Sequence, residues 1–154
     1  MQVTLNVRRY DPDSDQPVQY DQEYSVDVDE NATVLDGLIK VREEVDGSLA
    51  LRCSCRSAIC GSCVMRVNGQ AILACNTKLT DVVLEGGRLD IEPAGNMGLI
   101  KDLVVEFDIF WDKVRAVDPW LQPEGEEPES EYIAPNEDMV HLAGVMGCIM
   151  CGAC

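Results

Sequence analysis

The chain has 154 residues, enough for one ordinary domain or for a compact domain and part of a second. Its 12 Lys and Arg against 28 Asp and Glu give a formal net charge of −16, which argues against nucleic acid and anionic lipid surfaces as partners because both are polyanions. Apolar residues make up 46%, which argues against disorder, and no apolar run reaches the about 18 residues of a membrane span, so no direct span is expected.

Two strands and a helix are predicted in the first part of the chain. Apolar and polar residues alternate over residues 2–9 and again over 22–28, which indicates two half-buried strands joined as a long hairpin. Thr33 followed by Asp36 is typical of a helix N-terminus. The apolar residues that follow recur at helical spacing, so we predict a helix that ends before Gly47.

The middle of the chain is predicted to hold a loop, a second hairpin and a further strand. Residues 52–63 are rich in Cys, Ser and Gly and show little periodicity, so we expect a functional loop. Asn68-Gly69 suits a type I′ turn and predicts a tight hairpin over residues 64–75. Residues 88–92 indicate one more short strand.

The fold class that this order of elements predicts is α+β, in two parts. Residues 1–97 are expected to form a β-grasp domain, a mixed sheet packed on one helix. In the second part, residues 98–154, helical spacing predicts a long helix over 99–117 whose apolar stripe we expect to be core. Proline and glutamate make residues 118–136 an acidic linker, and a short helix is predicted over 137–146.

Eight cysteines form two groups, one in the middle of the chain and one at its end. We expect a reducing compartment, where clustered thiols are more often metal ligands or redox groups than disulfides. In the first group, Cys55, Cys60 and Cys63 have the C-x4-C-x2-C spacing of plant-type ferredoxins, and Cys75 follows after eleven residues. Four thiolates can hold a [2Fe–2S] cluster, and Gly61 lets backbone N–H groups approach the cluster closely. The first group therefore predicts a plant-type ferredoxin-like [2Fe–2S] domain.

A zinc site and buried free thiols are the alternatives for the first group. Zinc sites favour two C-x2-C pairs, and the first group contains one. Cys53 does not match the ferredoxin spacing, so we interpret it as a packed or idle cysteine.

Cys148, Cys151 and Cys154 form the second group, with the C-x2-C-x2-C spacing of three [4Fe–4S] ligands in bacterial ferredoxins. A [4Fe–4S] cluster needs a fourth ligand, and we find none for it in this chain, so we expect a real but incomplete [4Fe–4S] site. One alternative is a three-ligand zinc site, which His141 could complete. Another is a truncated fragment that binds nothing. We expect His141 to be an exposed helix residue instead.

The motifs together resemble one family. They occur in the run from Ser54 to Cys63, in Asn68-Gly69 with Cys75, in Ile100 to Val105, and in Cys148 to Cys151. With them, the chain resembles the N-terminal part of the iron–sulfur subunit of succinate dehydrogenase and fumarate reductase, ending inside the [4Fe–4S] motif. Small iron–sulfur subunits of molybdenum hydroxylases share the first spacing, but their second domain differs.

The resemblance implies an electron relay. In the family, an FAD-containing flavoprotein subunit oxidises succinate or reduces fumarate, and electrons pass through [2Fe–2S], [4Fe–4S] and [3Fe–4S] clusters to a quinone at membrane anchor subunits. The first cysteine group would hold the [2Fe–2S] cluster. The second would supply three [4Fe–4S] ligands at the start of an α-helical, bacterial-ferredoxin-like domain. This chain would hold no substrate-converting, catalytic residue.

The resemblance also implies that part of the subunit lies outside these 154 residues. That part would carry the remaining [4Fe–4S] ligand, the [3Fe–4S] ligands and the residues near the quinone. We therefore expect a fragment, with a split subunit as the second possibility.

The expected location is peripheral, on the cytoplasmic side of the inner membrane, because the first residues show neither a secretory h-region nor a transit peptide. The alternative function is a stand-alone soluble [2Fe–2S] ferredoxin, whose acidity suits transient docking on basic partners. A zinc-stabilised interaction module is a third hypothesis, which only the last three cysteines favour.

Overall fold

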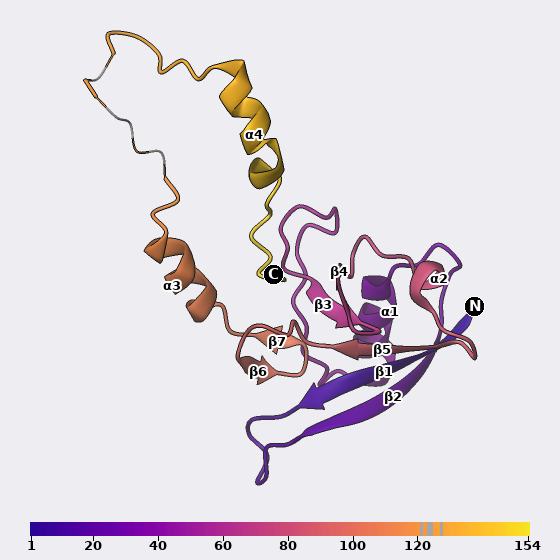
Figure 1. The fold of residues 1–154 in the computed structure, drawn as a ribbon. Helices are drawn as coiled ribbons and strands as arrows, with labels where there is room; N and C mark the ends of the chain where they lie inside the picture. Colours follow the sequence, from indigo (N-terminus) through magenta and orange to yellow (C-terminus); the bar gives the residue numbers. More distant parts are fainter. Residues whose placement is uncertain (121, 123–124, 127) are drawn as a thin grey trace.

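A five-stranded mixed sheet organises the first part of the chain. Its strands are β1 (Gln2–Tyr10), β2 (Gln19–Asp27), β3 (Val64–Val67), β4 (Gln70–Leu73) and β5 (Arg88–Glu92). The computed structural model describes residues 1–120, 122, 125–126 and 128–154. The strand order is β2-β1-β5-β3-β4, in which β1 and β5 are parallel and the other neighbours antiparallel (Figure 1). The predicted mixed sheet is therefore confirmed.

The main core lies between this sheet and helix α1 (Val34–Lys40). Val3, Leu5 and Val7 of β1 are almost completely buried and share one apolar cluster with Leu38 of the helix. Burying one such side chain contributes about 1.5–3 kcal/mol, so this cluster is the main source of stability. The predicted α+β class, with a sheet packed on one helix, is confirmed.

The predicted capping residues begin helix α1. The Asp36 N–H donates to Thr33 Oγ1 at 3.2 Å, and the Thr33 N–H donates to the Asp36 carboxylate at 2.9 Å. This reciprocal capping box satisfies two backbone donors that the first helical turn leaves free. The helix continues as one π-helical turn, η1 (Val41–Val45), and ends before Gly47 as predicted.

The hairpin of β3 and β4 turns at Asn68-Gly69, as predicted. Both residues have positive φ, 50° and 80°, which a type I′ turn requires. The Asn68 amide donates to the Val82 carbonyl at 2.6 Å, and its Oδ1 accepts from the Asp90 N–H at 3.0 Å. These bonds connect the turn to β5 and to α2 (Leu79–Val82), a single helical turn that the sequence pattern did not predict.

The prediction of one helix over residues 99–117 is wrong for its first half. The segment forms two paired strands and a shorter helix, β6 (Leu99–Lys101), β7 (Val104–Val105) and α3 (Asp108–Ala116). Asp102 turns the chain between the strands with φ of 46°. Leu103 and Val105 are each 4% exposed, so strand pairing and burial override the helical spacing. Helix α3 buries no residue, and the expectation that its stripe is core is wrong as well.

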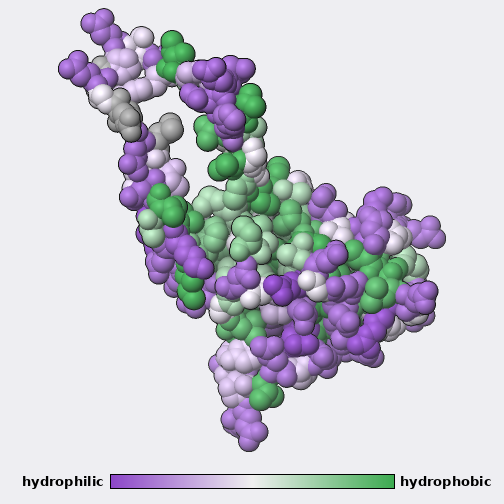
Figure 2. Space-filling view, viewed as in Figure 1, coloured by the Kyte–Doolittle hydropathy of each residue, from purple (hydrophilic) through white to green (hydrophobic). Residues whose placement is uncertain are grey.

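Helices α3 and α4 (Asn136–Met146) extend away from the sheet, and the chain then returns so that its end lies beside β3 (Figure 1). The predicted helix over 137–146 is confirmed. Large apolar side chains stay exposed along α4, where Figure 2 shows hydrophobic atoms on an otherwise hydrophilic arm. In the predicted acidic linker, residues 121, 123–124 and 127 lie outside the described residues. Among the helices of the described residues, none has the length and apolar character needed to cross a membrane.

Candidate metal centre

The β3–β4 hairpin brings two cysteines of the first group to the same place. Cys63 directly precedes β3 and is 3% exposed, and Cys75 follows shortly after β4. Because Val64 pairs with Leu73, the Ala74 N–H donates to the Cys63 carbonyl at 3.2 Å. The hairpin therefore returns Cys75 to the side of Cys63.

The loop before β3 directs backbone N–H groups at cysteine sulfur atoms. Cys55 Sγ accepts three such hydrogen bonds at 3.3–3.4 Å, and Cys75 Sγ accepts one from the Ala58 N–H at 3.4 Å. A thiolate is a strong acceptor, so the loop offers partial positive charge where negative sulfur is expected. The three donors to Cys55 belong to Ser57, Ile59 and Cys60.

Left-handed backbone shapes this loop. Arg56 and Ala58 have φ of 55° and 58°, and Gly61 has φ of 70°. Positive φ is uncommon for residues other than glycine, and it persists where the surrounding structure requires it. Alternating left-handed residues turn successive N–H groups toward one side and make an anion-binding concavity. The donor set and this concavity fit an iron–sulfur cluster.

The two cysteines at the end of the C-x4-C-x2-C run differ in acidity. The Ser62 hydroxyl, whose Oγ lies 3.1 Å from Cys60 Sγ, and nearby backbone N–H groups lower the pKa of Cys60 to about 6. Burial raises the pKa of Cys63 to about 11. Of these two cysteines, Cys60 is thus the one more readily present as the thiolate form that binds metal.

The thiols of the described residues do not converge as a mononuclear metal site would require. Among the described residues, no group of three or more His, Cys, Asp or Glu side chains is close enough to hold a metal ion. A [2Fe–2S] cluster divides four thiolates between two irons, so its ligands need not converge on one point. Cys53 packs, half-buried, against the main core, as expected of a packed cysteine.

The last cysteines lie against the first cysteine loop. A Cβ added to Gly61 would lie 2.8 Å from Cys151 Cβ, so the two backbones are in close contact. The Asn96 side-chain amide donates to the carbonyls of Ala153 and Cys154, each at 3.1 Å. Cys151 also packs in a small apolar cluster beside β3. The structure therefore brings the two cysteine groups together, although the sequence placed them in separate parts.

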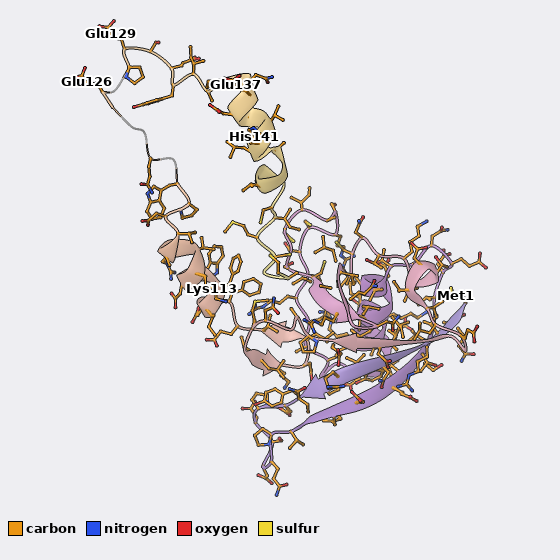
Figure 3. The ribbon with its side chains drawn as sticks, viewed as in Figure 1. Met1, Lys113, Glu126, Glu129, Glu137 and His141 are labelled. Atoms are coloured by element: carbon orange, nitrogen blue, oxygen red, sulfur yellow. The ribbon has the colours of Figure 1, made fainter. Side chains whose placement is uncertain are left out.

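His141 lies on helix α4, where it is exposed, as expected (Figure 3). Within the described part of the chain it forms no metal-binding group with the last three cysteines. The terminal segment repeats one feature of the first loop, since the Met150 N–H donates to Cys148 Sγ at 3.4 Å and Met150 has φ of 55°.

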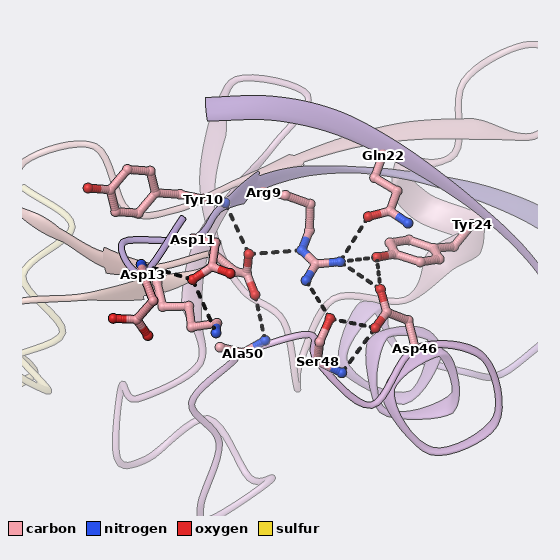
Figure 4. Close-up of polar contacts among 11 residues, drawn as sticks. Arg9, Tyr10, Asp11, Asp13, Gln22, Tyr24, Asp46, Ser48 and Ala50 are labelled. Carbon is pink, nitrogen blue, oxygen red and sulfur yellow. Dashed lines mark hydrogen bonds and ion pairs between the residues drawn. The ribbon is translucent and has the colours of Figure 1, made fainter. Parts of the chain in front are cut away.

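A buried ionic network holds the segment that leads to the cysteine loop (Figure 4). Arg9 donates to Asp102 at 2.8 Å, to Asp46 at 2.7 Å and to Ser48 Oγ at 2.9 Å. The second carboxylate oxygen of Asp102 accepts from the Ala50 N–H at 2.8 Å. The residues before the loop are thereby fixed to strand β1 and to the β6–β7 turn.

The electrostatics of this network favour its ionised form. Burial lowers the pKa of Arg9, but its hydrogen bonds to Asp102 and Asp46 have the larger combined effect and raise that pKa above its ordinary value. Hydrogen bonds from Ser48 and Tyr24 hold the pKa of Asp46 well below its usual range. The sequence patterns did not lead us to predict this network. The alternation along β1 could have indicated it, because Arg9 is on the same face of the strand as the buried valines and leucine. A buried arginine needs an acidic partner.

The family model of the "2Fe-2S iron-sulfur cluster binding domain" matches residues 4–112. The match includes all four cysteines of the first group and extends past residue 97, the predicted domain boundary. The segment of β6 and β7 is thus part of the matched region as well as of the buried cores.

Two curated proteins are similar to the chain over nearly its whole length. One is "Succinate dehydrogenase [ubiquinone] iron-sulfur subunit 1, mitochondrial" of Oryza sativa subsp. japonica, 37% identical over 98% of this chain and 54% of that protein. The other is "Succinate dehydrogenase iron-sulfur subunit" of Paracoccus denitrificans, 37% identical over 97% of this chain and 57% of that protein. The chain spans about half the length of these curated relatives.

A solved structure, "Mycobacterium smegmatis Sdh1 complex in the apo form", contains a chain of similar fold. It superposes with a TM-score of 0.85 at 26% sequence identity, covering 99% of this chain and 62% of that one.

Proposed function

Because the chain belongs to the 2Fe-2S iron–sulfur cluster binding domain family and is similar throughout to iron–sulfur subunits of succinate dehydrogenase, we propose that it is an electron-transfer subunit of a succinate:quinone oxidoreductase or fumarate reductase. In this proposal it passes electrons between an FAD-containing flavoprotein subunit and a membrane quinone. The observation that carries the proposal is the cysteine loop, with N–H groups directed at Cys55 and Cys75.

We assign the [2Fe–2S] cluster to the four cysteines of the first group. When bound, the cluster accepts and releases one electron without proton transfer to the protein. The chain fixes the sulfur ligands, surrounds them with hydrogen-bond donors and keeps Cys63 away from water. The assigned ligands are Cys55, Cys60, Cys63 and Cys75.

The second group extends the proposed relay. Cys148, Cys151 and Cys154 would be three of the four ligands of a [4Fe–4S] cluster, at the start of a bacterial-ferredoxin-like domain. Support comes from the contact of Cys151 with Gly61, which brings the second group close to the first. We propose that the fourth ligand and a [3Fe–4S] cluster belong to polypeptide outside these residues, since the relatives are about twice as long.

We also propose that the chain divides into a [2Fe–2S] domain, residues 1–97, and the start of a second domain, residues 98–154. We further propose that it is attached peripherally to membrane anchor subunits on the cytoplasmic side of the inner membrane. The similarity to a chain of the Mycobacterium smegmatis Sdh1 complex supports a place in a multi-subunit assembly.

The test is anaerobic purification of the assembly through a tag on this chain, followed by iron and sulfide analysis and EPR spectroscopy. We expect a flavin-containing subunit to co-purify, and succinate to produce the EPR signal of a reduced [2Fe–2S] cluster. A chain that purifies alone, with about two irons and no response to succinate, would instead support the stand-alone ferredoxin. A zinc-containing chain without sulfide would contradict both functions.

A further inference from the structure

In addition to nearby backbone N–H groups, a side-chain hydroxyl contacts the sulfur atom of Cys60 in the first loop. Cys55 and Cys75 accept hydrogen bonds from backbone N–H groups, whereas Cys60 Sγ lies 3.1 Å from the side-chain oxygen of Ser62. A thiolate bound to iron has no proton to donate. The Ser62 hydroxyl must therefore be the donor once Cys60 is a ligand.

Cys60 and Ser62 lie beside the terminal cysteine segment. Cys60 and Ser62 line an open groove of about 400 Å³ together with Ile149 and Met150 of the terminal cysteine segment. Cys60 is therefore on the side of the first loop that faces the second cysteine group. A donor at this sulfur would therefore act on a proposed cluster ligand that lies on the side of the terminal cysteine segment.

We propose that the Ser62 hydroxyl raises the reduction potential of the [2Fe–2S] cluster through its hydrogen bond to Cys60, an inference that depends on the ligand assignment in the proposed function. Reduction adds one electron to the cluster, and part of the added negative charge resides on the cysteine sulfurs. A hydroxyl donor stabilises that charge more in the reduced state than in the oxidised state. The proton stays on Ser62 Oγ, and no bond breaks in the step. Ser62 is thus a positioning residue that acts through Cys60.

The chain contains a matched control for this hydroxyl. Ser57 lies in the same loop, and its side chain donates to the Cys55 carbonyl at 3.0 Å rather than to a sulfur. Removing either hydroxyl deletes one oxygen from the loop, but only the change at Ser62 removes a hydrogen bond to sulfur. The two alanine variants therefore separate a sulfur-specific effect from a general effect on the loop.

The test is a redox titration of the purified assembly with dithionite, in which the EPR signal of the reduced cluster is measured at each potential. At a fixed potential, Ser62→Ala is expected to lower the ratio of reduced to oxidised cluster about tenfold, which is about 59 mV for a one-electron couple. Ser57→Ala should leave the ratio unchanged. Ser62→Thr, which keeps a hydroxyl, should restore the wild-type ratio, and Ser62→Val, which has the same shape without it, should not.

Three results would overturn the inference. The first is a loaded Ser62→Ala variant with the wild-type potential, and the second is an equal shift in Ser57→Ala. The third is a Ser62→Ala variant that cannot hold the cluster, because Ser62 would then support assembly rather than set the potential. Iron and sulfide analysis of the wild-type chain distinguishes these results from failure of the proposed function, in which the wild type itself would lack the [2Fe–2S] cluster.

Discussion

The two cysteine groups occupy very different surroundings. The first lies between the β3–β4 hairpin and a segment fixed by Arg9, and one of its members, Cys63, is 3% exposed. The second follows helix α4, on which Val140 is 65% and Val145 70% exposed, and its segment contacts Gly61 of the first loop and Asn96. A cysteine spacing therefore identifies candidate ligands in both regions. The first region adds to this a buried ligand candidate, Cys63, and a buried ionic network behind the loop.

The largest expected effect comes from removing a proposed ligand of the first group. Cys60→Ser should abolish or strongly change the [2Fe–2S] EPR signal, because serine replaces a thiolate ligand of one iron. Cys53→Ser is the matched control, since Cys53 packs on the core two residues before Cys55 and should leave the signal intact. Iron analysis and EPR spectroscopy of both variants test this prediction. Equal behaviour of the two variants would contradict the ligand assignment.

The next effect concerns the ionic network behind the first region. Arg9→Ala leaves the carboxylate of Asp102, which is 1% exposed, without its charged partner, so the free energy of unfolding should fall by about 3–5 kcal/mol. Arg115→Ala breaks the exposed pair with Asp112 on helix α3 and should cost less than about 1 kcal/mol. Urea unfolding of both variants tests the contrast. A small loss for Arg9→Ala would show that the network does not hold the first region.

The same substitution in the two regions gives a direct comparison of their packing. Leu38 is fully buried in the main core, so Leu38→Ala should lower the free energy of unfolding by about 2–5 kcal/mol. Leu142 on α4 is 45% exposed, so Leu142→Ala should change the free energy of unfolding by less than about 0.5 kcal/mol. Thermal unfolding of the isolated chain provides the values. A large loss at Leu142 would mean that α4 packs on something in solution.

The smallest expected effect is on pH dependence. The pKa of Asp46 is lower in the folded chain than in the unfolded one, so the unfolded state binds more protons as pH falls below about 4. Asp46 therefore stabilises the fold above that pH, and this contribution disappears in acid. Asp46→Asn should lower stability at pH 7 and make its decline below about pH 4 less steep. Measuring the free energy of unfolding against pH tests this, with Asp13→Asn in the exposed β1–β2 loop as the matched variant.

Local patterns in the sequence were sufficient for several elements. Thr33 and Asp36 are three residues apart, and Asn68 and Gly69 are adjacent, so the capping box and the type I′ turn depend on contacts within a few residues. The alternation along β1 likewise predicted its buried face. The C-x4-C-x2-C spacing predicted the ferredoxin-like class, which the family match supports.

Contacts between distant residues determine the elements that local patterns did not predict. Arg9 and Asp102 are 93 residues apart, and their bond helps to turn residues 99–105 into two strands where helical spacing had predicted a helix. The contact of Gly61 with Cys151 likewise joins two motifs that the sequence placed in separate parts. Periodicity reports which side chains can share a face, but it does not report which other segment will cover that face. That choice depends on burial and charge pairing in the assembled fold, where distant segments first meet.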